Sequence, residues 1–331
     1  MFQEIQTIQA AIRRHFSWAL LGLVVGAGAC GGGADSTGPS PSPNPNPNPN
    51  PSPNPSPNPN PLPIQGRAIF GVDLGNRLLL FSSGQPQTLL RASPITGLPA
   101  GARIVGLDFR PGTGGLYGVG LDSRLYTIDT LSGAATAVGG AFTPALTGEH
   151  FGMAFDPSGA VIRSHSVETN QNLRIDPAGG AAQGGPDLAF AAGDPNEGDN
   201  PAIAGTAYAP DGALYAIDAT ANTLLRLDTP DTGVLATIGG LGVNAYLCVG
   251  FDIAEDGTAY AALAGDAGST LYTVNLATGA AASVGAIGGG SAVQSIAIVP
   301  GAGSAQTRVA ASFAQHRASS RTPSASGGCH E

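Results

Sequence analysis

An arginine interrupts a series of small residues in the repeated strand-like segments of this chain. Arg163 stands where the sister segments have a small side chain (Gly118, Ala216 and Ala261). His165 stands where they have Gly120, Asp218 and Leu263. Asn172 and Arg174 follow in the next strand-like segment. Because a guanidinium suits recognition of an anion, we interpret Arg163, Asn172 and Arg174 as a candidate ligand-binding group. The alternative is an edge or surface substitution whose head group lies in water.

A second polar group occupies an unusually long segment between two of the repeated units. Its oxygen-bearing side chains are Asp194, Asn196, Glu197, Asp199 and Asn200. Closely spaced oxygens can bind calcium, so Asp194 and Asp199 are candidate calcium ligands. The segment lacks the full twelve-residue calcium-loop pattern, and an Asp/Asn/Gly/Pro loop held by local hydrogen bonds is the alternative. Because this loop leads out of the unit that holds Arg163, we expect its acids to lie close to Arg163, Asn172 and Arg174.

Catalytic motifs are missing from the sequence. The body of the chain, residues 65–300, has two histidines, His150 and His165, and neither stands in a metal-ligand spacing. No Ser lies in a Gly-x-Ser-x-Gly elbow, and neither a phosphate loop nor a dinucleotide fingerprint occurs. We therefore predict no cofactor other than the calcium considered above.

Charge and cysteine content exclude further classes of protein. The body carries nine Arg against twenty Asp and Glu, a net charge of −11, and the chain has no Lys. Such a surface repels phosphate backbones, so we expect no nucleic-acid partner. Cys30, Cys248 and Cys329 are too widely spaced for a disulfide framework. We interpret Cys248, which lies in an apolar stretch predicted to be a strand, as a small core residue.

The two ends of the chain differ from the body in composition. Residues 1–29 have a basic flank and a short apolar run, which is typical of a secretory signal peptide, and Cys30 follows where a lipoprotein signal would be acylated. Cleavage near Ala29 without a lipid is the alternative. Residues 30–64 repeat Pro-Asn and Pro-Ser, which favours an extended linker, and residues 301–331 are predicted to be disordered. We expect a lipid-anchored protein of the bacterial cell envelope, on the outer membrane or cell surface, or otherwise a secreted one.

A strand-like motif recurs through the body. It occurs at Gly106–Phe109, Gly152–Phe155, Gly205–Tyr208 and Gly250–Ile253, with a fifth version at Ser295–Ile298. The intervals are 46, 53, 45 and 45 residues, and turns rich in Gly and Asp follow the motif in several units. A period of 40 to 50 residues built from short strands predicts the blades of a β-propeller.

The ends of the body predict how many blades there are. Three strands without a first strand are expected at its start, at Ala68–Val72, Arg77–Ser82 and Thr88–Arg91, and a first strand alone at its end, Gln294–Val299. An open solenoid would need polar caps instead of such complementary fragments. Pairing them removes exposed strand edges. We therefore predict an all-β propeller of five four-stranded blades, closed by pairing the N- and C-terminal strands in one blade.

The body from Ala68 to Pro300 resembles an uncharacterised bacterial family, a domain of unknown function found in secreted and cell-surface proteins. The stretches that carry the resemblance are Gly106–Pro111, Asn172–Pro177 and Gly193–Pro201. The resemblance implies a propeller-like, exported domain and brings no assigned activity. Ala154 and Gly159–Val161 depart from the pattern of the family's second unit.

Two classes of function remain open. The first is a non-catalytic surface module, a monomer presented on a stalk, that binds an extracellular ligand or an envelope protein. The second is an extracellular hydrolase or lyase with a site on the propeller face, which a metal at an axial channel lined by Asp108 and Asp252 would favour. The few His residues and the missing nucleophile motif favour the first class.

Overall fold

The computed structural model describes residues 65–301. The predictions for the signal peptide, Cys30, the linker and the tail therefore lie outside the described residues. The described part is all β apart from one short 3-10 turn, η1 (Pro230–Thr232). No helix within residues 65–301 is long and apolar enough to cross a membrane.

Five antiparallel sheets form the five blades. Blade 1 contains β21 (Val293–Ile298), β1 (Ala68–Asp73), β2 (Arg77–Ser82) and β3 (Arg91–Pro94). Blade 2 contains β4 (Ile104–Phe109), β5 (Leu116–Gly120), β6 (Arg124–Ile128) and β7 (Ala135–Val138). Blade 3 contains β8 (Phe151–Phe155), β9 (Ile162–Ser166), β10 (Asn172–Ile175) and β11 (Ala182–Gly184).

The two remaining blades differ in one strand. Blade 4 contains β13 (Ile203–Tyr208), β14 (Leu214–Asp218), β15 (Thr223–Leu227) and β16 (Val234–Gly240). Its outer edge gains a short parallel strand, β12 (Ala189–Phe190), from the segment that leaves blade 3. Blade 5 contains β17 (Val249–Ile253), β18 (Ala259–Gly265), β19 (Gly268–Val274) and β20 (Ala281–Ala286).

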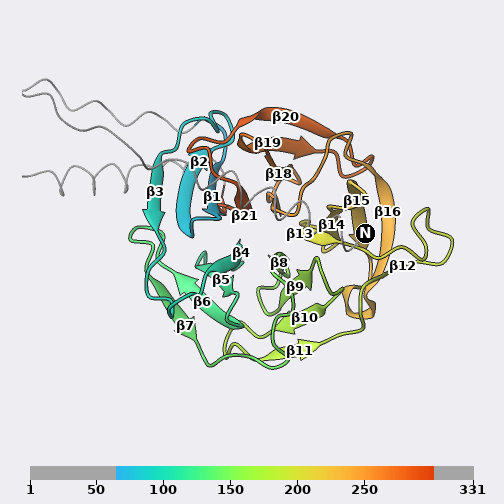
Figure 1. Cartoon of the computed structure of the whole chain (residues 1–331), viewed down its shortest axis with the longest axis horizontal. Coiled ribbons are helices and arrows are strands. Elements are labelled where there is room, and N and C mark those ends of the chain that lie inside the picture. Colours follow the sequence, from blue (N-terminus) through green and yellow to red (C-terminus); the bar gives the residue numbers. More distant parts are fainter. Residues whose placement is uncertain (1–64, 302–331) are drawn as a thin grey trace, which may run out of the picture. The chain divides into compact units, whose positions relative to one another are not determined.

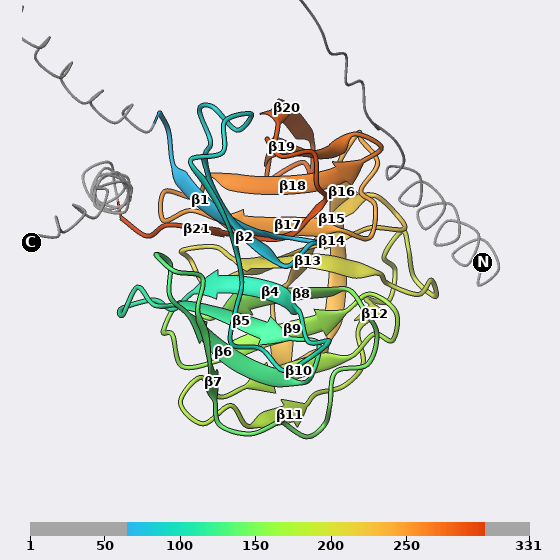
Figure 2. The same ribbon diagram turned by 60° about the vertical axis from the view of Figure 1, so that its left-hand side comes forward.

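The blades surround a common centre (Figure 1). The inner strands contact one another in the order β4, β8, β13, β17, β21 and back to β4. The view in Figure 2 shows strands of neighbouring blades running side by side across the ring. The prediction of a propeller with five four-stranded blades is confirmed, and all five copies of the sequence motif lie on inner strands.

Blade 1 is assembled from both ends of the body. β21 pairs with β1 in antiparallel register, with Ile69 opposite Ile298. The outermost strand of this blade is β3, Arg91–Pro94, and the prediction of a strand at Thr88–Arg91 was wrong for its first residues. Residues 86–90 form a turn and bends instead, and the Thr88 amide donates to the Gln85 carbonyl.

A glycine on each of four inner strands allows the next blade to approach closely. A Cβ at that position would lie within 2.8 Å of an atom on the following inner strand. The contacts are Gly106 with Met153, Gly152 with Thr206, Gly205 with Phe251, and Gly250 with Ile296. On β21 the equivalent residue is Ser295, whose Oγ accepts a hydrogen bond of 2.9 Å from the Leu107 amide of the next blade.

Apolar side chains fill the joints between blades and make up most of the core. Each of the five clusters of buried apolar residues lies mainly between two neighbouring blades. The joint between blades 3 and 4 is an exception in composition, because Ala154 is the one residue of the blade 3 strands in its cluster. Polar side chains of blade 3 occupy the rest of that joint.

Candidate functional site

The predicted ligand-binding residues of blade 3 share one face of that blade. In the antiparallel pairing of β9 with β10, Arg163 lies opposite Arg174 and His165 lies opposite Asn172. Residues directly opposite each other in an antiparallel pair project to the same side of the sheet. Their hydrogen bonds are made to residues of blade 4 or of the segments beside it, so this face is the one turned toward blade 4.

Asp231 in the η1 turn of blade 4 pairs with both arginines. Its Oδ1 forms an ion pair with Arg163 Nη2 and lies 3.3 Å from Arg174 Nη1. Asn172 Nδ2 donates to the carbonyl of Pro230 in the same turn, at 3.1 Å. The hydrogen bond from Arg163 lowers the pKa of Asp231. Since the Arg163 side chain is only 5% exposed, the group clamps two blades together more than it faces solvent.

His165 completes this polar joint. Its side chain is fully buried and Nδ1 lies 3.0 Å from Thr206 Oγ1 on the inner strand of blade 4. Burial and the charge of Arg163 lower the pKa of His165 to about 3, so the imidazole is neutral at physiological pH. Arg163 Nε is buried with no hydrogen-bond partner among the described residues.

The loop from Asp194 to Asn200 is held by contacts of its own. Asp194 accepts hydrogen bonds from the amide and the hydroxyl of Thr237 in β16, at 2.6 and 2.7 Å, and Asn196 Nδ2 donates to the same hydroxyl at 2.9 Å. Asn200 Oδ1 accepts a hydrogen bond from Asn170 of blade 3.

The structure also shows the contacts of the remaining acids of this loop, Glu197 and Asp199. Glu197 accepts from the Gly193 amide, and the Asp199 amide donates to the Asn196 carbonyl. Within the described chain, the ion pairs of Arg163 and Arg174 go to Asp231 and not to this loop. No group of three or more His, Cys, Asp or Glu among residues 65–301 is arranged to hold a metal ion.

Asp108 and Asp252 lie on inner strands, and the side chains of both accept hydrogen bonds from backbone amides. Asp108 accepts hydrogen bonds from its neighbour Phe109 and from Phe155 of the next blade, at 2.7 and 2.6 Å. Asp252 does the same with Ile253 and with Ile298. Burial raises the pKa of both carboxyl groups, and their mutual repulsion raises that of Asp108 further. These acids therefore join blade 2 to blade 3 and blade 5 to blade 1.

A cluster of charged and nucleophilic side chains lies where the inner strands begin. His150 directly precedes β8, and its Nδ1 lies 2.7 Å from Oε1 of Glu168, which follows β9. Arg103, just before β4, donates to the Glu149 carbonyl at 3.4 Å. We call Arg103, Glu149, His150, Glu168 and Cys248 the rim cluster.

Cys248 joins this cluster from blade 5. It is a free cysteine immediately before β17 and is half-buried, so its interpretation as a core residue within a strand was wrong. Burial alone would lower the pKa of His150, but hydrogen bonds and charge interactions with Cys248 and Glu168 raise it to about 9. The pKa of Glu168 is lowered because His150 and two backbone amides offset its burial.

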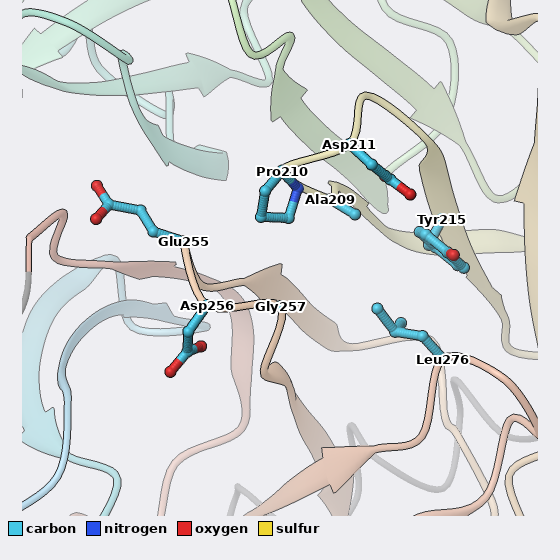
Figure 3. Close-up of a pocket in the computed structure, with 8 residues that line it drawn as sticks. All are labelled: Ala209, Pro210, Asp211, Tyr215, Glu255, Asp256, Gly257 and Leu276. Carbon is cyan, nitrogen blue, oxygen red and sulfur yellow. The ribbon is translucent and has the colours of Figure 1, made fainter.

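An open pocket lies at the opposite ends of the inner strands (Figure 3). It has a volume of about 350 Å³ between the β13–β14 and β17–β18 turns, and its lining includes Asp211, Tyr215, Glu255 and Asp256. Two of its acids bind the ends of the described body, because Asp256 pairs with Arg67 and Glu255 accepts from the Gly301 amide at 3.2 Å. Two of the acids in the pocket wall thus hold the two ends of the described body in place.

Sequence reasoning missed both Asp231 and the rim cluster. Asp231 follows a strand in a Thr-Pro-Asp-Thr turn, which reads as an ordinary turn. His150, Glu168 and Cys248 are separated by 18 and 80 residues, and no local spacing connects them. The sequence offers one signal for two of them. His150 and Cys248 each stand just before a copy of the recurring inner-strand motif.

No curated protein sequence matches this chain. Solved structures show weak similarity. Hydrazine synthase from Kuenenia stuttgartiensis aligns at 18% identity and a TM-score of 0.37, over 56% of this chain and 49% of that one. A protein of unknown function from Bacteroides thetaiotaomicron aligns at 13% identity and a TM-score of 0.44, over 66% and 55%. The chain thus spans about half the length of these two proteins.

A third structure is similar over more of its length. Virginiamycin B lyase from Staphylococcus aureus aligns at 12% identity and a TM-score of 0.39, over 66% of this chain and 69% of that one. At such TM-scores none of the three supports an inference about activity. The family described as domain of unknown function (DUF4394) matches residues 77–297, which run from β2 in blade 1 to near the end of β21. The chain belongs to this DUF4394 family.

Proposed function

We propose that this protein is an exported, lipid-anchored propeller that binds a component of the bacterial cell envelope at its rim cluster. In this proposal Cys30 carries the lipid, residues 31–64 act as a spacer, and the monomeric ring recognises its partner with Arg103, Glu149 and neighbouring side chains. The observation that carries the proposal is the position of the rim cluster relative to the ends of the described body.

The chain ends and the rim cluster lie at opposite ends of the inner strands. Arg67 and Gly301, at the two ends of the described body, contact Asp256 and Glu255 in the turn after β17. Cys248 precedes β17, so this five-residue strand separates the two faces by roughly 17 Å. The described body therefore begins and ends near one face of the ring, and the rim cluster lies on the other face.

The alternative of a metal-dependent hydrolase or lyase receives no support from the axial acids. Each carboxylate of Asp108 and Asp252 already accepts two backbone hydrogen bonds that join neighbouring blades. A metal ion would have to displace those bonds. Not every side chain of the rim cluster is occupied by structural contacts in this way, since the Glu149 side chain is 61% exposed.

Co-sedimentation with isolated cell-envelope fragments tests the proposed binding face, with every protein carrying Cys30→Ser so that the proposed lipid does not itself bind the membrane. Replacing Arg103 and Glu149 together by Ala should weaken binding by at least about tenfold, which corresponds to about 1.4 kcal/mol. The matched control is Asp211→Asn, in the pocket on the other face, which should bind like the wild type. Equal binding by all three proteins would place the binding site elsewhere.

Metabolic labelling tests the proposed anchor. A fatty-acid analogue should label the wild type and leave Cys30→Ser unlabelled, because acylation needs the thiol. Equal labelling of both proteins would contradict the anchor without affecting the binding face.

We also propose that the pairing of β1 with β21 is the closure that holds the ring together. It is supported by the register from Ile69–Ile298 to Asp73–Val293, which supplies blade 1 with its inner strand.

A further inference from the structure

Three buried side chains in the joint between blades 3 and 4 carry polar atoms that the described chain does not satisfy. Arg163, His165 and Asn172 are each at most 4% exposed. The atoms without a hydrogen-bond partner among residues 65–301 are Arg163 Nε and Nη1, His165 Nε2 and Asn172 Oδ1. Leaving a buried polar group unpaired is costly, most of all on a charged side chain, so these atoms point to a missing partner.

The strand register places all three side chains on one face of blade 3. Arg163 and His165 are two residues apart on β9 and project to the same side of the sheet, and Asn172 lies opposite His165 on β10. Their other polar atoms are already fixed. His165 Nδ1 lies 3.0 Å from Thr206 Oγ1, and Asn172 Nδ2 donates to the Pro230 carbonyl at 3.1 Å. The unpartnered atoms therefore face the inner strand of blade 4 and the η1 turn.

The charges of this joint do not balance. Among the described residues, Arg163 and Arg174 form ion pairs with Asp231 and with no other carboxylate. His165 adds no charge, because burial and the charge of Arg163 lower its pKa to about 3. Tyr208 of β13 is influenced by Arg163 but keeps its proton, because burial raises the pKa of its hydroxyl. Two guanidinium groups thus share one carboxylate, which leaves one positive charge in excess.

This excess charge favours an anion over a water molecule as the missing partner. Water would complete the hydrogen bonds of Arg163 and leave its charge unbalanced, whereas an anion does both through charge-assisted bonds. Nε and Nη1 of the guanidinium can only donate. Asn172 has a raising effect on the pKa of His165, which fits an amide oxygen that attracts the Nε2 proton. With its proton on Nε2, His165 is a further donor on this face.

The packing of the joint limits the size of such an anion. A Cβ at Gly152 would lie 2.2 Å from Thr206 Oγ1, so the inner strands leave no room for a bulky ligand at that end. The other end meets solvent, because Asp231 is exposed and Arg174 is half-buried. An ion can thus enter beside the η1 turn, provided that it is small.

We propose that the joint between blades 3 and 4 binds a small monovalent anion of the size of chloride, held chiefly by the Arg163 guanidinium with His165 Nε2 as a further donor. The anion balances the second arginine and strengthens the polar joint. The site uses none of the residues of the rim cluster, so this inference does not depend on the proposed function.

Thermal unfolding of the full-length chain in matched salts tests the proposal. Sodium chloride replaces sodium gluconate, whose anion is too large for the joint, at a constant ionic strength of about 0.15 M. We expect chloride to raise the Tm of the wild type by about 3 °C or more, because a ligand that binds only the folded state stabilises it. Arg163→Met, which keeps most of the volume, should lose this rise. Arg226→Met removes an arginine on the surface of blade 4 and is the matched control, which should keep it.

A second variant and a direct measurement complete the test. Asn172→Asp keeps the size of the side chain and supplies a fixed negative charge, so its Tm should not depend on chloride. Crystals of the wild type grown in sodium bromide should give an anomalous signal at hydrogen-bond distance from the Arg163 guanidinium. Equal chloride effects on the wild type, Arg163→Met and Arg226→Met would overturn the proposal, as would water at that position instead of bromide. A bromide signal without the Tm rise would mark an adventitious ion only and would overturn it too.

Discussion

Two joints of the ring solve the same packing problem with different chemistry. Between blades 5 and 1, Gly250 faces Ile296, and the surrounding cluster of Ile69, Leu79 and other apolar residues fills the joint. Between blades 3 and 4, Gly152 faces Thr206, whose hydroxyl meets the buried His165. The close approach of the inner strands is common to both, so the blade geometry does not require an apolar joint.

The difference shows that the joint between blades 3 and 4 buries polar groups at a cost in folding stability. An apolar joint gains about 25 cal/mol for each Å² that it removes from water. A buried ion pair gains much less, because desolvation offsets most of its attraction. Arg163 reaches past its own blade to Asp231, an exposed residue, so part of its charge remains near solvent. We therefore expect the polar joint to be the weaker one and the apolar joint to carry the closure.

Removing the strand at the apolar joint should have the largest effect. Deletion of Gln294–Pro300 removes all of β21 except Val293 and leaves most of β1 without its neighbour, so we expect the body to lose cooperative unfolding. That would amount to the whole free energy of unfolding, typically about 5–15 kcal/mol. Circular dichroism during a thermal ramp measures it. Deletion of residues 302–331 is the control, and identical melting of both truncations would show that the pairing of β1 with β21 does not close the ring.

Filling the glycine position tests whether the close approach matters equally in both joints. At Gly250, an added Cβ would lie 2.8 Å from the Ile296 backbone nitrogen, which cannot rotate away. We expect Gly250→Ala to lower the free energy of unfolding by about 1–3 kcal/mol in urea denaturation. Gly152→Ala should do the same and also disturb the hydroxyl of Thr206. Gly140→Ala has no atom within 4 Å of the new methyl group and should stay within about 0.5 kcal/mol of the wild type.

The architecture of the ring could be predicted from the sequence, and the partners of its polar side chains could not. Strand periodicity and the recurring glycine motif arise from local geometry that each blade repeats, so the number of blades could be predicted from the sequence. Arg163, Asn172 and Arg174 were also grouped from the sequence, and the structure places them on one face of blade 3. Their partner Asp231 depends on which turn of the next blade reaches back, a distance of 57 to 68 residues along the chain.

The rim cluster illustrates a second limit. His150 and Glu168 lie on the same blade, 18 residues apart, and Cys248 comes from another blade through the curvature of the ring. Apolar neighbours in the sequence suggested a core position for Cys248. Local hydrophobicity does not show whether a residue at the end of a strand packs into the core or lies near the surface. Burial at such boundaries is set by tertiary packing.

Replacing Arg163 should separate the role of its charge from the role of its volume. Arg163→Ala removes the clamp to Asp231 and leaves a cavity, so we expect a loss of about 2–3 kcal/mol in the free energy of unfolding. Arg163→Met retains most of the volume and removes the buried Nε that has no partner in the described chain, so it should lie within about 1 kcal/mol of the wild type. Equal losses in both variants would show that the ion pair itself stabilises the joint.

The polar joint should also make stability depend on pH in a way that the apolar joint does not. His165 has a pKa of about 3 in the folded protein, below its ordinary value of about 6.5. Between these values the unfolded chain binds a proton that the folded chain does not. His165 therefore contributes stability that is fully present above pH 6.5 and is lost as the pH falls toward 3.

The size of this effect follows from one proton. Its contribution changes by up to about 1.4 kcal/mol per pH unit within the window. Urea denaturation of the wild type and of His165→Gln between pH 4.5 and 6.5 measures the difference in slope, since the carboxylates contribute equally to both. We expect the steeper fall on acidification in the wild type.

His150 gives a control of opposite sign. Its pKa is raised to about 9, so its contribution is fully present below about pH 6.5 and is lost as the pH rises through 9. His150→Gln should therefore flatten the alkaline limb of the stability curve and leave the acidic limb unchanged, whereas His165→Gln should do the reverse. If both variants alter the same limb, or neither alters any, then the buried imidazole of the polar joint is not neutral in the folded ring, and the contrast between the two joints does not extend to their response to pH.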